Sequence, residues 1–144
     1  AQASSEGATV VFTNGCFDIL HIGHTRYLAD AKSLGTILVV GVNSDSSVRR
    51  LKGETRPIVP EGERVEMLEA LSSVDHALLF DEDTPIELIK QVKPNKLVKG
   101  GDWPVETIVG NEFVASYGGQ TLSLPFVDGS STTSIVERVV ERCC

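Results

Sequence analysis

Apolar residues recur along the chain in two alternating rhythms, one typical of strands and one typical of helices. The run from Thr36 to Val42 is apolar almost throughout, as expected for a parallel strand covered on both faces. Elsewhere apolar residues fall three or four positions apart, which predicts helices. The pattern predicts strands over Thr9–Thr13, Thr36–Val42, Val74–Phe80, Asn95–Lys99 and Gln120–Leu124, and helices over Gly23–Leu34, Glu63–Ser72, Thr84–Val92, Val105–Tyr117 and Thr132–Arg142.

This alternation of strands and helices determines the expected fold. Successive parallel strands are joined by right-handed crossovers, and the crossovers place helices on the sheet faces. We therefore expect an α/β fold, a Rossmann-like open parallel five-stranded sheet with helices on both faces. It forms a single domain over residues 9–144 after a disordered lead-in over residues 1–8. Such sheets bind ligands at the carboxyl ends of their strands, so the loops there are the candidate site.

Composition narrows the class of protein. The 144 residues are 41% hydrophobic and 23% charged, which is ordinary for a packed domain. A formal net charge of −7 disfavours non-specific binding to nucleic acid or to an anionic membrane. No apolar run approaches the roughly 18 residues of a spanning helix, and residues 1–8 lack the features of a secretory signal. The three cysteines, Cys16 and the neighbouring pair Cys143 and Cys144, suggest no disulfide framework. We therefore expect reduced thiols in a cytoplasmic protein.

Two histidines follow a glycine bend at the end of the first predicted strand. Gly15 allows a tight turn and a close approach to phosphate, and the helix that begins near Gly23 directs free N–H groups to the same point. His21 and His24 are three residues apart, so their imidazoles can converge and donate hydrogen bonds to an oxyanion. The alternatives are that they cap the helix, pack in the protein, or bind zinc. No Cys or Glu stands at a spacing that would complete a four-ligand zinc site. No P-loop and no Gly-x-Gly-x-x-Gly motif is present.

Three further segments follow predicted strands. Lys52 lies in a basic loop expected over 43–56, which is either an ordinary basic surface or an anion site. Gly100 and Asp102 lie in a glycine-rich loop that would let a flat base approach the backbone, with Trp103 beside them expected to pack rather than stack. The hydroxyls at the start of the last helix either cap that helix or hold phosphates; they belong to Ser131, Thr132 and Thr133.

These motifs together resemble a known family. The segment Gly15-Cys16-Phe17-Asp18 followed by His21-x-Gly23-His24, with Ser131-Thr132-Thr133 near the carboxyl end, resembles the cytidylyltransferase-like nucleotidyltransferases. A narrower resemblance is to the heptose 1-phosphate adenylyltransferase domain of the bifunctional enzymes of lipopolysaccharide synthesis. It rests on Leu51-Lys52-Gly53, Arg56-Pro57, Val74-Asp75, Glu82-Asp83-Thr84-Pro85 and Leu97-Val98-Lys99-Gly100-Gly101-Asp102.

The resemblance implies a reaction: AMP passes from ATP to D-glycero-β-D-manno-heptose 1-phosphate, giving ADP-heptose and pyrophosphate. It implies Mg²⁺ as the cofactor with no dedicated protein metal site, ATP and a sugar 1-phosphate as partners, a homodimer, and a sugar kinase that is fused or separate. The open alternatives are a cytidylyltransferase acting on glycerol 3-phosphate or another phospho-alcohol, and a non-catalytic nucleotide-binding module. The arginine of the glycerol-phosphate enzymes is absent from Val127-Asp128-Gly129-Ser130, which weakens the cytidylyl alternative.

The resemblance also implies roles for individual residues. His21, His24 and Lys52 would be catalytic, and Lys52 and Asp18 would bind the acceptor, with Asp18 alternatively fixing its loop. Arg64 matches an arginine near the base in relatives, or pairs with Glu61 or Glu66 on its own helix. The nucleotide would be bound by Asn14, Gly15, Cys16, Phe17, Gly23, Gly100, Asp102, Ser131, Thr132 and Thr133.

Overall fold

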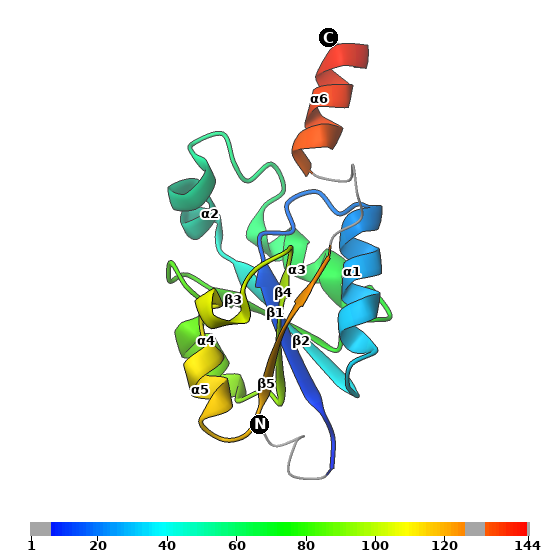
Figure 1. Cartoon of the computed structure of the whole chain (residues 1–144). Coiled ribbons are helices and arrows are strands. Elements are labelled where there is room, and N and C mark those ends of the chain that lie inside the picture. Colours follow the sequence, from blue (N-terminus) through cyan, green and yellow to red (C-terminus); the bar gives the residue numbers. More distant parts are fainter. Residues whose placement is uncertain (1–6, 126–131, 144) are drawn as a thin grey trace.

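A parallel sheet lies at the centre of the computed structural model, which describes residues 7–125 and 132–143 (Figure 1). Within residues 7–125, five strands pair in the order β3-β2-β1-β4-β5, and every neighbouring pair is parallel. The order reverses between β1 and β4, because the chain first builds outward through β2 and β3 and then returns to the other side of β1. The strands are β1 (Val10–Gly15), β2 (Ile37–Asn43), β3 (His76–Phe80), β4 (Lys96–Gly100) and β5 (Gln120–Leu124).

Helices cover both faces of this sheet, as the sequence predicts (Figure 1). Val11 and Leu38 face α1 and α3, whereas Phe12 and Val39 face α4 and α5, so alternate residues of one strand feed two separate cores. All four side chains are almost fully buried. The helices are α1 (Ile22–Lys32), α2 (Asp45–Lys52), α3 (Glu61–Glu69), α4 (Ile86–Val92), the 3₁₀ turn η2 (Val105–Thr107), α5 (Asn111–Ala115) and α6 (Thr132–Cys143).

Three predicted elements differ from the structure for local reasons. The loop expected over 43–56 contains α2, whose amino end is capped by the Ser44 hydroxyl, which accepts from the Ser47 N–H at 3.2 Å. The cap expected at Thr84 is wrong: α4 begins at Ile86 after Pro85, without a side-chain cap. The helix expected over 105–117 is split into η2 and α5, because Gly110 adopts a φ of 95° that a helix does not accommodate.

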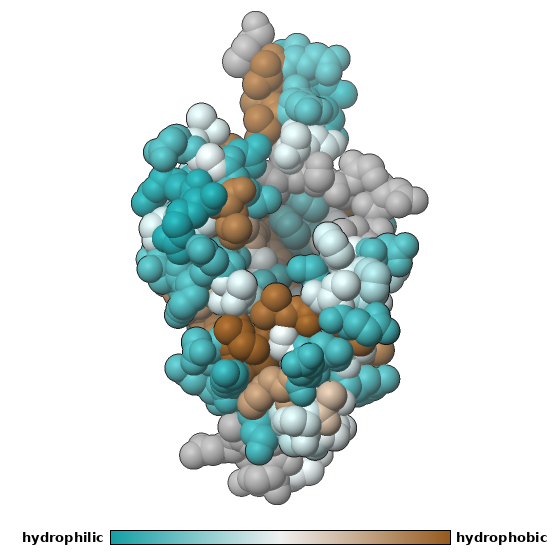
Figure 2. All heavy atoms as spheres, turned by 60° about the vertical axis from the view of Figure 1, so that its left-hand side comes forward, coloured by the Kyte–Doolittle hydropathy of each residue, from teal (hydrophilic) through white to brown (hydrophobic). Residues whose placement is uncertain are grey.

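The last helix stands away from the sheet and extends the molecule in one direction (Figure 1). Its apolar strip remains uncovered and is visible as the brown spheres at the top of Figure 2, where Val139 and Val140 are about half exposed. No helix of the described residues has the length and apolar character that crossing a bilayer requires. The first six residues of the predicted lead-in and residues 126–131 lie outside the described part of the chain.

Candidate active site

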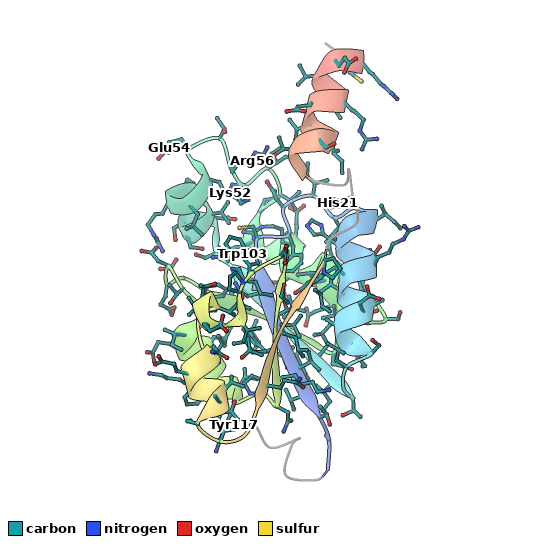
Figure 3. All side chains as sticks on the ribbon, in the orientation of Figure 1. His21, Lys52, Glu54, Arg56, Trp103 and Tyr117 are labelled. Atoms are coloured by element: carbon teal, nitrogen blue, oxygen red, sulfur yellow. The ribbon has the colours of Figure 1, made fainter. Side chains whose placement is uncertain are left out.

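A cavity of about 480 Å³ opens at the carboxyl ends of β1 and β4, on either side of the point where the strand order reverses. Open parallel sheets bind their ligands at this position. Figure 3 shows four of the lining side chains around the upper end of the sheet, with His21 on the right, Lys52 and Arg56 on the left, and Trp103 below Lys52. The cavity is lined by Asn14, Gly15, Cys16, Phe17, Asp18, His21, His24, Tyr27, Lys52, Arg56, Lys99, Gly100, Trp103 and Thr133.

The two histidines form one stacked pair inside this cavity. Their ring centroids are 3.9 Å apart with an angle of 26° between the planes, and the Phe17 ring meets His24 edge-on at 5.2 Å. His21 is also the N-cap of α1, because its Nδ1 accepts a hydrogen bond from the Gly23 N–H at 3.1 Å. In the neutral ring the proton therefore resides on Nε2, which is left to donate to a ligand. Capping and ligand binding, considered as alternatives from the sequence, are compatible in this residue.

The surroundings of the pair keep both rings uncharged. Burial lowers the pKa of His21 below its ordinary value. The pKa of His24 falls to about 4 through burial first and the nearby His21 second, while a backbone interaction with Ile19 acts in the opposite direction. Each neutral imidazole donates a single hydrogen bond, and an incoming phosphate would favour the protonated form of both. The pair can therefore respond to anionic charge that develops between the ligand and the rings.

Gly15 is required here for packing. A Cβ on Gly15 would lie 2.9 Å from Cε2 of Phe17, closer than real Cβ atoms approach a neighbour. Phe17 itself is only 6% exposed and has a positive φ of 49°, an unusual conformation for a residue with a side chain. Gly15 thus lets the Phe17 ring fold back beneath His24. Its predicted contact with phosphate stays a prediction.

Burial also sets the chemistry of Cys16. Burial raises the pKa of its thiol, although Lys52 and Arg64 nearby act in the opposite direction. The side chain is thus a thiol at neutral pH, and nothing prepares it to act as a nucleophile. Cys16 and Cys143 are the free cysteines of the described residues.

Asp18 holds a neighbouring segment of the chain. Its carboxylate accepts hydrogen bonds from the Ile58 N–H at 2.9 Å and the Val59 N–H at 2.8 Å, and Arg56 Nη1 lies 3.6 Å from Oδ2. Of the two roles considered from the sequence, fixing a loop is the one these contacts display. A direct contact between Asp18 and an acceptor sugar stays a prediction.

Arg64 is buried inside the protein rather than exposed on its helix. Its guanidinium donates to the backbone carbonyls of Cys16, Asn43 and Val59 at 2.7 to 2.9 Å and pairs with Asp45 at 2.9 Å. It therefore pairs with Asp45 and not with Glu61 or Glu66 on its own helix. The nearness of Glu61 and Glu66 in the sequence does not predict this contact, which depends on segments distant in the sequence meeting at Arg64.

Positive charge gathers in the cavity although the protein is acidic. Lys52, Arg56 and Lys99 line it, whereas Asp18 is the one lining carboxylate among the described residues and is engaged by Arg56 and two backbone N–H groups. Lys52 is exposed at the last residue of α2, which corrects its expected place in a loop. A site with this balance favours a ligand with several negative charges.

Trp103 also lines the cavity, although the sequence predicts that it packs against the protein rather than stacks on a ligand. The indole is 50% exposed, its Nε1 donates to the Gly100 carbonyl at 3.1 Å, and Lys99 Nζ lies 5.2 Å from the ring centroid. A half-exposed ring fixed in this way offers a face on which a planar or cyclic ligand can stack. Asp102 precedes it, exposed and outside the residues that line the cavity.

Ten of the predicted site residues line this cavity together: Asn14, Gly15, Cys16, Phe17, Asp18, His21, His24, Lys52, Gly100 and Thr133. The Gly23 N–H donates to the His21 cap and Gly23 is not among the lining residues, and Ser131 and the Thr132 side chain lie outside the described atoms. Four lining residues are not among the predicted site residues. Arg56, Lys99 and Trp103 belong to motifs or loops quoted from the sequence, a signal that was available, whereas Tyr27 lies on the apolar face of the helix predicted over Gly23–Leu34.

The described residues offer no ready site for a metal ion. No three His, Cys, Asp or Glu side chains among them converge as a metal ligand set would. Asp18 has its oxygens committed to the backbone and to Arg56. A divalent cation would therefore enter on the oxygens of a nucleotide, since Mg²⁺ is commonly held by substrate phosphates.

The fold, the strand-end cavity and the histidine pair together define a nucleotidyltransferase, and comparison with known families agrees. Residues 12–138 match the family model described as cytidylyltransferase-like, and the chain belongs to that family.

The relatives are more specific. The chain is 57% identical to the bifunctional protein HldE of Syntrophotalea carbinolica over 136 residues, which cover 94% of this chain and 28% of that protein. It is 52% identical to the bifunctional protein HldE of Geobacter sulfurreducens over 141 residues, covering 98% and 29%. The chain thus spans under a third of the length of these curated relatives. A lipopolysaccharide core biosynthesis protein from Thermoplasma volcanium, solved as a crystal structure, superposes with a TM-score of 0.66 at 32% identity and covers 84% of this chain and 98% of that one.

Proposed function

We propose that this domain transfers AMP from ATP to D-glycero-β-D-manno-heptose 1-phosphate, releasing pyrophosphate and ADP-heptose for the lipopolysaccharide core. The observation that carries the proposal is the stacked His21–His24 pair in a cavity that also collects Lys52, Arg56 and Lys99. The identity to HldE proteins and to a lipopolysaccharide core biosynthesis protein supports this choice of substrate.

The reaction asks for positioning and charge stabilisation. An oxygen of the sugar phosphate attacks the α-phosphorus of ATP, a new P–O bond forms, and the bond to the bridging oxygen breaks as pyrophosphate leaves. Negative charge develops on the α-phosphate and on the leaving group. The Nε2–H of His21 and the single N–H of neutral His24 donate to these oxygens, where preorganised donors are most effective. Neither histidine has to form a covalent bond.

The remaining lining residues divide between the two substrates. Lys52 and Arg56 bind phosphate oxygens from the side opposite the histidines, and Thr133, with Ser131 and Thr132, binds the outer phosphates at the start of α6. Asn14, Gly15, Cys16 and Phe17 shape the nucleotide site from the β1 end, and Gly100 shapes it from the β4 end. Gly23 contributes through the hydrogen bond from its N–H to His21, and Asp102 contributes from beside Trp103. Mg²⁺ accompanies ATP and neutralises part of its charge.

The wider setting follows from the relatives. Since they are bifunctional and far longer than this chain, the domain works with a sugar kinase that supplies the 1-phosphate, either fused or separate. ATP and sugar phosphates are abundant in the cytoplasm, so we place the reaction there. A homodimer is part of the same proposal.

Pyrophosphate release decides the proposal. The protein is incubated with Mg²⁺ and each pairing of ATP or CTP with heptose 1-phosphate, glucose 1-phosphate or glycerol 3-phosphate, and reactions without acceptor measure the background. We expect release with ATP and heptose 1-phosphate far above every other pairing. Release with CTP and glycerol 3-phosphate alone would establish the cytidylyltransferase alternative, and nucleotide binding without release from any pairing would indicate a binding module.

A further inference from the structure

Two buried charges of opposite sign hold the same short stretch of chain. Among the described residues, Asp18 and Arg64 are the charged side chains that are buried, at 5% and 1% exposure. The Asp18 carboxylate accepts from the Val59 N–H at 2.8 Å, while Arg64 Nε donates to the Val59 carbonyl at 2.9 Å. Both the N–H and the carbonyl of Val59 are thus hydrogen-bonded to charged side chains.

The same two charges connect this stretch to the loop that carries the histidines. Asp18 belongs to that loop, and Arg64 Nη1 donates to the Cys16 carbonyl at 2.7 Å. Arg64 also reaches the end of β2 through the Asn43 carbonyl and the start of α2 through Asp45. The ends of β1 and β2 and the stretch around Val59 therefore meet on one guanidinium, whose fork of donors suits several acceptors at once.

Stability alone explains this arrangement poorly. Burying a charge costs several kcal/mol, and well-packed apolar residues often do as well or better in its place. The segment held in this way, residues 53–60, has few other fixed points: Gly53 adopts a φ of 102° with open space around it, and Glu54 and Thr55 are exposed. It nevertheless presents Arg56 to the cavity and follows directly from Lys52.

We propose that Asp18 and Arg64 are positioning residues that fasten segment 53–60 to the histidine loop, so that Lys52 and Arg56 face His21 and His24 across the cavity. This inference rests on the proposed function for its kinetic part only. Asp18 acts through Arg56, because its Oδ2 lies 3.6 Å from Arg56 Nη1 and orients the guanidinium. Arg64 is not among the residues that line the cavity and acts through backbone carbonyls, including that of the lining residue Cys16.

The test uses Arg64→Lys and Asp18→Asn, with Arg50→Lys as the matched control. Arg50 sits on α2 and also pairs with an aspartate and a carbonyl, Asp83 and Asp81, but on the surface and away from the cavity. Hydrogen exchange of the Ile58 and Val59 amides reports on the fastening. Binding of inorganic pyrophosphate, measured by calorimetry, reports on the placement of the cations and does not depend on turnover.

In Arg64→Lys we expect exchange at these two amides to rise at least about tenfold, with β1 amides unchanged, and pyrophosphate affinity to fall about tenfold. Asp18→Asn keeps one acceptor oxygen and gives a smaller change in the same direction, and Arg50→Lys gives neither. In turnover assays the KM for the sugar phosphate should rise more than kcat falls, because the histidines stay in place.

Protected amides in both variants would overturn the inference, and so would faster exchange with unchanged pyrophosphate affinity, which would make the two charges purely structural. If Arg64→Lys fails to fold, Asp18→Asn alone decides between these outcomes. Absence of pyrophosphate release by the wild type would overturn the proposed function and leave the exchange and binding results standing.

Discussion

The cavity has two walls that are held by different kinds of interaction. The β1 wall comprises Asn14 to His24 with segment 53–60. The side chains that pack against His24 and Arg56 are buried: Phe17 is 6% exposed and Asp18 5%. The β4 wall comprises Lys99 to Trp103, and Trp103 is 50% exposed and contacts Gly100, Ser123 and Lys99.

The contrast indicates a division of labour. Groups that stabilise developing charge must be held within a fraction of an ångström, which the buried β1 wall provides. Side chains that recognise the variable part of a ligand can stand on an exposed wall, where exchanging them costs the fold little. We therefore expect substitution of the histidines in the β1 wall to lower the rate, and substitutions in the β4 wall to raise KM.

The largest effect should come from His24 in the β1 wall. In His24→Asn the carboxamide keeps a donor but loses the imidazole that stacks on His21 and can accept a proton as charge develops. We expect kcat for pyrophosphate release to fall about 100-fold or more, by analogy with the loss of one oxyanion donor elsewhere. The control is His76→Asn, an exposed histidine at the start of β3, which should leave kcat unchanged. A kcat within threefold of wild type in His24→Asn would remove the pair from the mechanism.

The second effect is on stability against pH. The pKa of His24 is lowered to about 4 in the folded protein, whereas an unfolded histidine titrates near 6.5. Between these values the unfolded chain binds more protons, so stability is retained above pH 6.5 and is lost as the pH falls toward 4. After discounting for partial exposure we expect about 2 kcal/mol from this group. Urea unfolding at pH 7 and pH 4.5 measures this contribution, and the free energy of unfolding should fall less between the two pH values in His24→Asn than in the wild type. An equal fall in both proteins would contradict the burial of this ring.

The third effect tests the β4 wall with a matched pair of cations. Lys99 Nζ lies 5.2 Å from the centroid of the Trp103 ring, and Lys93 Nζ lies 5.1 Å from the centroid of the Tyr117 ring. Figure 3 labels the two rings, which lie at opposite ends of the sheet. Lys99→Met should raise the KM for ATP or the sugar phosphate about tenfold, because it removes a cation from the cavity. Lys93→Met removes the same kind of contact outside the cavity and should leave KM unchanged. Similar KM values in the two variants would place the β4 wall outside the site.

The sequence predicted the local features of the site better than the contacts between distant segments. The β1 wall follows from local spacing: Gly15, His21 and His24 lie within one turn and one helix start, and local geometry brings the imidazoles together. The five strands and both helical layers follow equally from periodicity. What the sequence could not supply depends on contacts between distant segments.

Particular residues show this limit. Arg64 lies 48 residues from Cys16, whose carbonyl it binds, and no pattern on α3 predicts that meeting. The helix α2 was missed because it is polar, with Val48 as its one buried apolar residue, so it has no apolar period. Tyr27 fitted the apolar face of α1, and its placement follows from a hydroxyl contact with Thr13 at 2.6 Å that composition does not reveal.

The smallest effect concerns how the β4 wall is fastened. The Ser123 hydroxyl of β5 donates to the Gly101 carbonyl and accepts from the Trp103 N–H at 3.2 Å, so one side chain ties the loop to the sheet. Ser123→Ala leaves that carbonyl and N–H to water at an exposed site, which should cost less than about 1 kcal/mol of stability. The indole would then be less well oriented, and we expect the KM for nucleotide to rise by about two- to threefold with kcat unchanged. Ser116→Ala is the control, since its hydroxyl makes a similar bond to the Phe113 carbonyl on α5, outside the cavity, and should leave KM unchanged. A fall in kcat without a change in KM would mean that the β4 wall takes part in the chemical step, and the division of labour between the walls would have to be abandoned.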